Sequence, residues 1–152
     1  MAATQIALEN VQIGFKNFAG VEGPYNASGD RNFVVFLPKE TAEQLASEGW
    51  NVKFPKPVEN FDPDRDYERD PYLPVALSFN SYPPKVVLVT QDNVTRLDES
   101  TVDMLDWADI ESVDIVIRPY NWSVGSKSGV KAYTKALYVT IRTDAFDSKY
   151  GI

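Results

Sequence analysis

The chain contains no cysteine and no histidine. Without cysteine it can form no disulfide, thiolate nucleophile or cysteine-ligated zinc site. Without histidine it has neither the commonest general base nor the usual side-chain ligand for zinc, copper and non-haem iron. Carboxylate, lysine or tyrosine chemistry and carboxylate-bound magnesium are the enzymatic options that remain. We therefore expect a protein that is not an enzyme and that carries no metal or other cofactor.

Long hydrophobic runs are also missing. No stretch reaches the roughly 18 apolar residues that suggest a membrane helix, and residues 1–5 lack the basic and apolar regions of a signal peptide. The sequence thus predicts a cytoplasmic protein without a membrane partner. Its 152 residues suit one domain, 1–152.

The acidic excess is concentrated in one segment. The net charge is -7, and residues 59–70 hold six acids and two arginines, which accounts for -4 of it. We expect an exposed acidic, proline-rich loop at about 55–71 and a flexible tail at about 144–152. Asp62, Asp64 and Asp66 alternate as in the start of a calcium loop. Pro63 and Arg65 interrupt that pattern and its glycine is absent, so a solvated loop is the better interpretation.

Alternating apolar residues predict a mainly β protein. Val11, Ile13 and Phe15 share one face of a first strand, and further strands are expected at 33–37, 50–54, 73–79 and 85–90, with a short strand or a turn at 94–97. Short helices are expected at about 38–48 and 101–109, with Trp50 in the core. A hairpin of 113–124 and 130–142 ends the fold. This order favours a Greek-key barrel of the oligonucleotide-binding (OB) type, with a β-sandwich as the alternative.

The hairpin is the best candidate for a binding site. From Ile115 to Thr143 the sequence has five basic residues and no acidic one. In an extended strand the side chains of Arg118, Tyr120 and Trp122 point to one face. Those of Ile115, Ile117 and Pro119 point to the other. After a turn at 124–129, Lys131, Tyr133 and Lys135 also share a face. Leu137, Val139 and Ile141, at the next alternate positions, are expected on that same face. That face is therefore expected to change from polar to apolar along its length.

A surface with aromatic rings beside cations is typical of proteins that bind single-stranded nucleic acid, because bases stack on flat rings and cations contact the phosphates. The predicted contacts in the hairpin are Arg118, Tyr120, Trp122, Lys127, Lys131, Tyr133 and Lys135. Tyr25 and Arg31, in the glycine-rich loop before the second strand, and Lys53 are further candidates. The rings can equally serve core or subunit packing, and the lysines can simply increase solubility.

Several stretches of the sequence resemble single-stranded-DNA-binding proteins of tailed phages. They are Gly29–Phe33, Gly49–Lys53, Ile117–Trp122 and Gly129–Tyr133. The resemblance spans about residues 8–141 and implies an OB barrel that coats single strands during replication or recombination. Many such proteins end in a strongly acidic tail that recruits partners. Residues 144–152 match that tail only faintly.

The leading hypothesis is therefore a non-enzymatic single-stranded-DNA-binding protein, with replication or recombination proteins or a second copy of the chain as further partners. One alternative is a structural module whose aromatic face contacts another subunit. The other is a magnesium-dependent enzyme that uses Asp103, Asp106 and Asp109. The sequence leaves DNA versus RNA, oligomeric state and site size open.

Overall fold

The structure is a computed structural model that describes residues 4–24, 28–55, 59, 62, 70–80, 83–90 and 93–142. Its elements are β1 (Ile6–Val11), β2 (Ile13–Asn17), β3 (Arg31–Phe36), α1 (Lys39–Ser47), β4 (Tyr72–Leu77), β5 (Lys85–Val89), β6 (Val94–Leu97), the 3-10 helix η1 (Val102–Asp106), β7 (Ile110–Val124) and β8 (Lys127–Ile141). The predicted class, mainly β with two short helices, is confirmed. In this part of the chain, no helix has the length and apolar character needed to cross a membrane.

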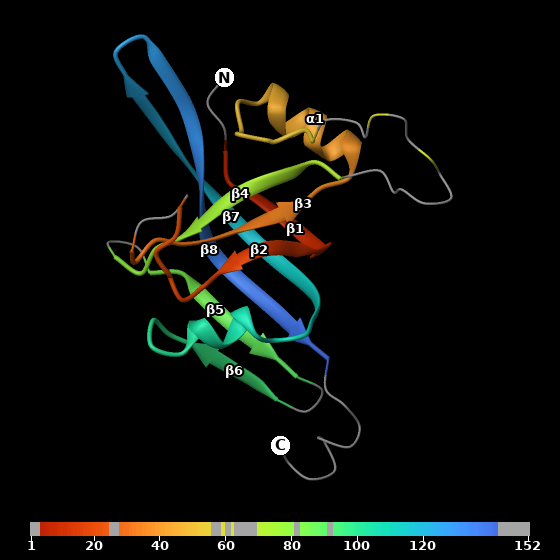
Figure 1. Cartoon of the computed structure of the whole chain (residues 1–152), viewed down its shortest axis with the longest axis vertical. Coiled ribbons are helices and arrows are strands. Elements are labelled where there is room, and N and C mark those ends of the chain that lie inside the picture. Colours follow the sequence, from red (N-terminus) through yellow and green to blue (C-terminus); the bar gives the residue numbers. More distant parts are fainter. Residues whose placement is uncertain are drawn as a thin grey trace.

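The eight strands form one sheet around the β7–β8 hairpin (Figure 1). β7 pairs with β1, while β8 pairs in parallel with both β4 and β5. β3 lies between β4 and β2, and β6 pairs with β5. The ladder of the described residues does not close into a barrel, but its end strands, β1 and β2, are separated in sequence by Gln12 alone. The sheet is thus OB-like and curls back on itself, while remaining open.

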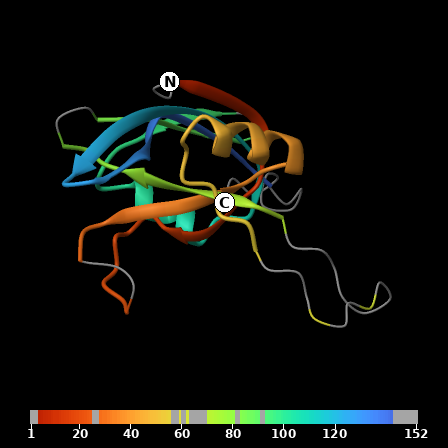
Figure 2. The same cartoon turned by 90° about the horizontal axis from the view of Figure 1, so that it is seen from above.

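The hairpin strands extend beyond the rest of the sheet. Each has 15 residues, and their connected ends project from the body of the molecule (Figures 1 and 2). Val124 pairs with Lys127, so the turn consists of Gly125 and Ser126 and is shorter than predicted. Gly125 has a φ of 61°. A positive φ at the first turn residue is typical of a type II′ turn and favours glycine there.

Strand β7 has the two faces that its sequence predicts. Ile115 and Ile117 are buried in the core, and Pro119 beside them is half-buried. The side chains of the alternate residues point to the opposite face, where Tyr120 and Trp122 are exposed. Alternation therefore identified the outward face of this strand correctly.

Strand β8 does not keep one parity throughout. Val116 pairs with Ala136 and Ile117 with Thr134, so Lys135 is an extra residue in a β-bulge. Before the bulge the even-numbered residues are buried, and after it the odd-numbered Leu137 and Val139 are buried. The prediction that Lys131 and Leu137 share a face is wrong, because one extra residue moves every following side chain to the other face.

Strand β2 also departs from simple alternation. Gly14 pairs with Val34 and Asn17 with Asn32, so Phe15 and Lys16 lie opposite the single residue Phe33. Phe15 has a φ of 46° and is 74% exposed. The prediction that Phe15 joins Val11 and Ile13 on an inward face is therefore wrong at Phe15.

Helix α1 lies at the end of the sheet where β3 finishes (Figures 1 and 2). It buries Ala42 and Leu45 against the core, and Trp50 after it is buried as predicted. The strand expected at 50–54 is not formed. Trp50 and Lys53 make isolated bridges to β8 and β4 respectively.

Candidate nucleic-acid interface

A groove of about 930 Å³ lies between the hairpin and the outer face of β3 and β4. Its floor includes two cross-strand pairs, Asn32 with Ala76 and Val34 with Pro74. The hairpin contributes Trp122, Ser128, Gly129, Val130, Lys131, Ala132 and Tyr133. The hairpin tip lies on the same side of the molecule as the end of β2 and the start of β3 (Figures 1 and 2). The groove thus combines a floor of mixed polar and apolar residues with a wall of rings and one lysine.

The indole of Trp122 lies on Gly129, its partner across the hairpin. A Cβ atom at Gly129 would lie only 2.9 Å from Cζ2 and 3.0 Å from Cε2 of that indole. The glycine therefore leaves the space that the ring occupies. Trp122 is nevertheless 38% exposed, so part of its ring remains free for stacking. This combination of support and exposure suits a base-stacking platform.

Tyr133 holds two cations beside this platform. The guanidinium of Arg118 lies over its ring at 4.9 Å from the centroid, and the ammonium of Lys131 lies over it at 5.1 Å. Tyr120 meets the same ring edge-on at a centroid distance of 6.2 Å. Cation–π attraction is worth about 0.5–1 kcal/mol at exposed sites. The ring of Tyr133 therefore orders two positive charges next to the groove.

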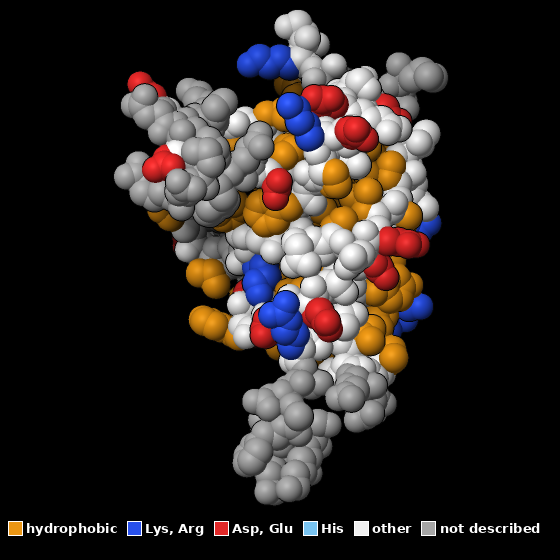
Figure 3. All heavy atoms as spheres, turned by 90° about the vertical axis from the view of Figure 1, so that its right-hand side faces the viewer, with side chains coloured by type: hydrophobic (Ala, Val, Ile, Leu, Met, Phe, Trp, Pro, Cys, Tyr) orange, Lys and Arg blue, Asp and Glu red, His pale blue; other side chains and the backbone are white. Residues whose placement is uncertain are grey.

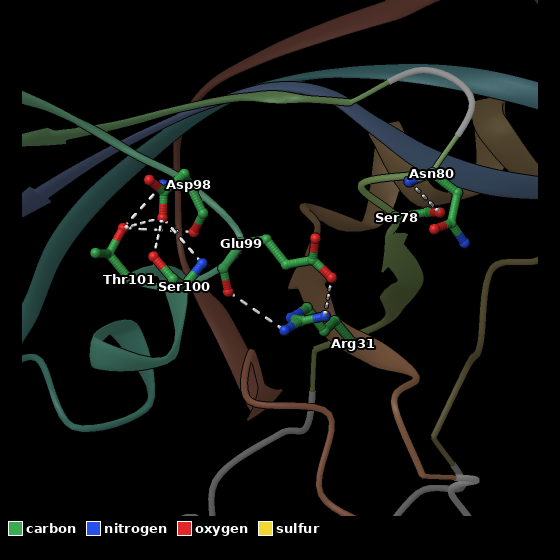
Figure 4. Close-up of polar contacts among 7 residues, drawn as sticks. All are labelled: Arg31, Ser78, Asn80, Asp98, Glu99, Ser100 and Thr101. Atoms are coloured by element: carbon green, nitrogen blue, oxygen red, sulfur yellow. Dashed lines mark hydrogen bonds and ion pairs between the residues drawn. The ribbon is translucent and has the colours of Figure 1, made fainter.

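Arg31 lines the groove but is held by Glu99 (Figure 4). Its Nη2 donates a hydrogen bond of 3.3 Å to the Glu99 carbonyl, and its Nη1 lies 3.8 Å from the carboxylate. The guanidinium also lies 5.7 Å from the ring centroid of Phe79. Its buried Nε has no hydrogen-bond partner among the residues that the structure describes. Arg31 is thus a groove residue whose charge is partly balanced within the protein.

The remaining predicted residues are dispersed. Lys127 is exposed at the hairpin turn, and Lys135 donates a hydrogen bond of 2.9 Å to the Gln5 side chain. Lys53 is exposed beside β4, where its backbone bonds to Tyr72, and it does not belong to the groove lining. Tyr25 lies outside the described residues. The structure therefore brings Trp122, Lys131, Tyr133 and Arg31 into one groove, with Arg118 and Tyr120 beside it.

The charge of the groove itself is balanced. Its described lining contains two cations, Arg31 and Lys131, and two acids, Asp30 and Glu99. Figure 3 draws another face of the molecule, the right-hand side of Figure 1, and there too acidic and basic side chains are interspersed around hydrophobic ones. Attraction for a phosphate backbone must therefore come mainly from the hairpin. The two acids of its strands, Glu111 and Asp114, lie at the start of β7, and residues 115–141 contain no acid.

Apart from Arg31, sequence reasoning missed the part of the groove formed by β2, β3 and β4. Phe15 lines it although its parity indicated a core position, and Glu99 enters it from the loop before η1. The floor residues Val34, Pro74 and Ala76 are ordinary strand residues and carry no signal of a site. Only the bulge in β2 and the pairing of β3 with β4 bring these residues together.

Two of the three aspartates of the magnesium alternative, Asp106 and Asp109, have structural roles. Asp106 accepts hydrogen bonds from the backbone amides of Phe18 (2.7 Å) and Ala19 (3.0 Å), which ties η1 to the end of β2. Asp109 forms an ion pair with Arg142 at 3.9 Å. Among the described residues, no group of three or more acidic side chains is gathered as a metal ion would require. The possible calcium ligands from 63 to 69 lie outside the described residues.

Asp98 organises the loop that carries Glu99 (Figure 4). Its carboxylate accepts hydrogen bonds from the Ser100 hydroxyl (2.6 Å), the Ser100 amide (2.9 Å) and the Thr101 hydroxyl (3.1 Å). These bonds stabilise the charged form and lower the pKa of Asp98, with the bond from the Ser100 side chain contributing most. The loop is thereby fixed where Glu99 meets Arg31.

Comparison with known proteins places these features in a family. The model of the family described as "Putative phage ssDNA-binding domain" matches residues 1–152. No curated protein sequence matches. Among solved structures, the single-stranded DNA-binding protein of bacteriophage Enc34 in complex with ssDNA has a TM-score of 0.57 at 14% identity, with 94% of this chain and 89% of that chain covered.

A C-terminal truncation of the same Enc34 protein gives a TM-score of 0.55 at 13% identity, with 93% and 87% of the two chains covered. At such identities these structures share the fold with the chain. The family match over the full length carries the assignment, and the chain therefore belongs to the phage single-stranded-DNA-binding domain family.

Proposed function

We propose that this protein binds and coats single-stranded DNA without sequence preference, as a non-enzymatic accessory of phage replication or recombination. Membership of the family supports the ligand class, and the similar Enc34 protein was solved in complex with ssDNA. The observation that carries the proposal is the exposed indole of Trp122, supported by Gly129 and placed beside Lys131 in a groove.

Each part of the interface has a chemical role. Trp122 and Tyr120 stack bases, while Arg118, Lys127, Lys131 and Lys135 meet phosphates. Tyr133 holds Arg118 and Lys131 in place. Stacking tolerates any base because every base has a π-face, so these contacts give affinity without sequence readout. The protein would act in the host cytoplasm, where replicating phage DNA is exposed.

Arg31, Tyr25 and Lys53 are secondary in this proposal. Arg31 must exchange part of its contact with Glu99 for a phosphate, and Lys53 lies outside the groove lining. Tyr25, the acidic loop at about 55–71 and the tail at about 144–152 stay predictions from the sequence. Recruitment of replication or recombination proteins and self-association are proposed as consequences of coating.

The test is a titration of a fluorescent single strand of about 30 nucleotides at two salt concentrations and against duplex. We expect single-strand preference and a decrease of about 0.7 log unit in affinity per phosphate contact for each log unit of salt. Trp122→Ala should cost about 1–3 kcal/mol of binding free energy. Trp107→Ala is the matched control, because Trp107 is 91% exposed and outside the groove lining.

The same protein should also be analysed by size-exclusion chromatography. Assembly of the free protein without retention of single strands would favour the alternative, a structural module that uses its aromatic face for subunit contacts. Unchanged binding by Trp122→Ala would reject the stacking role of that residue even if the protein binds single strands.

A further inference from the structure

A second group of rings lies at the β2 side of the groove. Phe15 lies 6.0 Å from the ring centroid of Tyr72 and 6.4 Å from that of Phe36, and the latter two rings lie 6.3 Å apart. Phe15 is 74% exposed, whereas Phe36 and Tyr72 are half-buried beneath it. Phe15 lines the same groove as Trp122, so one continuous hollow has an exposed ring on the hairpin and another on β2.

The backbone of β2 is distorted in a way that presents Phe15. Its φ of 46° is a left-handed conformation, which is an outlier for a bulky residue. The bulge of Phe15 and Lys16 against Phe33 reverses the expected direction of the Phe15 side chain. Such strain persists only where the surrounding structure imposes it, and it concentrates at ligand-binding positions. Bulges re-aim side chains in the same way.

Gly14 provides the space for this arrangement. A Cβ atom there would lie 2.7 Å from Cε2 and 2.9 Å from Cζ of Phe36. The Phe36 ring therefore occupies the place of the missing side chain and supports Phe15 from one side, as Gly129 supports Trp122. Two glycines thus permit two exposed rings in one groove. Packing alone does not account for Phe15, since a ring that is 74% exposed gains little from burial.

We infer that Phe15 is a second base-stacking platform, so that a single strand bound at the hairpin continues across the outer face of β4 and β3 to β2. This inference rests on the proposed function. It adds the path of the bound single strand over the protein and a second contact for an unpaired nucleobase. The apolar floor residues Pro74, Val34 and Ala76 between the platforms suit sugars and base edges. Arg31 lies along the same path.

The test compares oligothymidines of two lengths, about 4 and about 16 nucleotides, the range of site sizes that single OB folds show. Phe15→Ala should leave the affinity for the short oligomer unchanged and weaken the long one by about 5- to 140-fold, as loss of one stacked base predicts. Trp122→Ala should weaken both. Phe15→Leu, which keeps an apolar side chain without a ring, should behave as Phe15→Ala.

Thermal unfolding separates binding from structure. Phe15→Gly relieves the unfavourable φ, so its Tm should equal or exceed that of the wild type while its affinity for the long oligomer falls. Wild-type affinity of Phe15→Ala and Phe15→Leu for the long oligomer, with Trp122→Ala impaired, would overturn the inference and leave the proposed function intact. Failure of the wild type to bind either oligomer would overturn both.

Discussion

Replacement of Gly129 by alanine tests the support of the Trp122 platform without touching the ring itself. The new Cβ would lie 2.9–3.1 Å from three indole atoms, whereas carbon atoms prefer about 3.5–4.0 Å. The indole must therefore move by roughly 0.5–1 Å or rotate into solvent. The backbone of Gly129 is not in the left-handed region, so alanine is acceptable there in all other respects.

The expected effect on stability is small. Forcing extra volume into a packed site costs about 1–3 kcal/mol, but Trp122 is exposed enough to move aside and avoid most of this cost. Alanine also gains about 0.5–1 kcal/mol over glycine within a strand. The free energy of unfolding should thus change by less than about 1 kcal/mol, while binding of a single strand loses up to the roughly 1–3 kcal/mol of a stacked base.

Fluorescence titration with oligothymidine and a thermal melt measure the two quantities. Gly23→Ala is the matched control, because a Cβ atom at Gly23 would have no neighbour within 4 Å. The reasoning is refuted if Gly129→Ala shows a shifted indole emission, as a displaced ring requires, and still binds with wild-type affinity.

Three further predictions concern the cations, the loop before η1 and the core. Tyr133→Leu should weaken binding and lower the salt dependence by about 0.7 per lost phosphate contact, whereas Tyr133→Phe keeps both, as titrations at several salt concentrations would show. Asp98 has a lowered pKa, so its contribution to stability is present above about pH 3.9 and lost as pH falls through the lower folded-state pKa. Melts from pH 7 to pH 2 should show this loss in the wild type, and the difference from Asp98→Asn should vanish at the acid end. Leu137→Ala should cost about 2–5 kcal/mol in denaturant unfolding, because Leu137 is fully buried; a cost below 1 kcal/mol would contradict its place in the core.

The sequence predicted what depends on uninterrupted alternation. In β7, Ile115 and Ile117 are inward and Tyr120 and Trp122 are outward, because the extra residue of the bulge at this point of the ladder lies in β8 and β7 keeps its alternation. The hairpin, its glycine turn and its basic character follow from the same local pattern. The family resemblance, stated on hairpin and loop residues, agrees with the match over residues 1–152.

The errors arise where one residue interrupts the ladder. The bulge at Lys135 places Leu137 on the face opposite Lys131. The bulge at Phe15 directs the side chain of this expected core residue toward the groove. No glycine or proline marks the position of Lys135, whereas Gly14, directly before Phe15, is a local signal that is compatible with a bulge. The contact of Arg31 with Glu99 joins positions 68 residues apart, which only the fold brings together. Local pattern thus identified the hairpin wall of the groove but not its floor.

Hydrogen–deuterium exchange with and without a long oligothymidine tests the central claim most directly, because it locates the bound strand on the protein. We expect slower exchange at residues 118–133 of the hairpin and along β3 and β4, with α1 and the β5–β6 pair unchanged. Slower exchange confined to α1 or β5–β6, with the hairpin unaffected, would contradict this account of the binding groove.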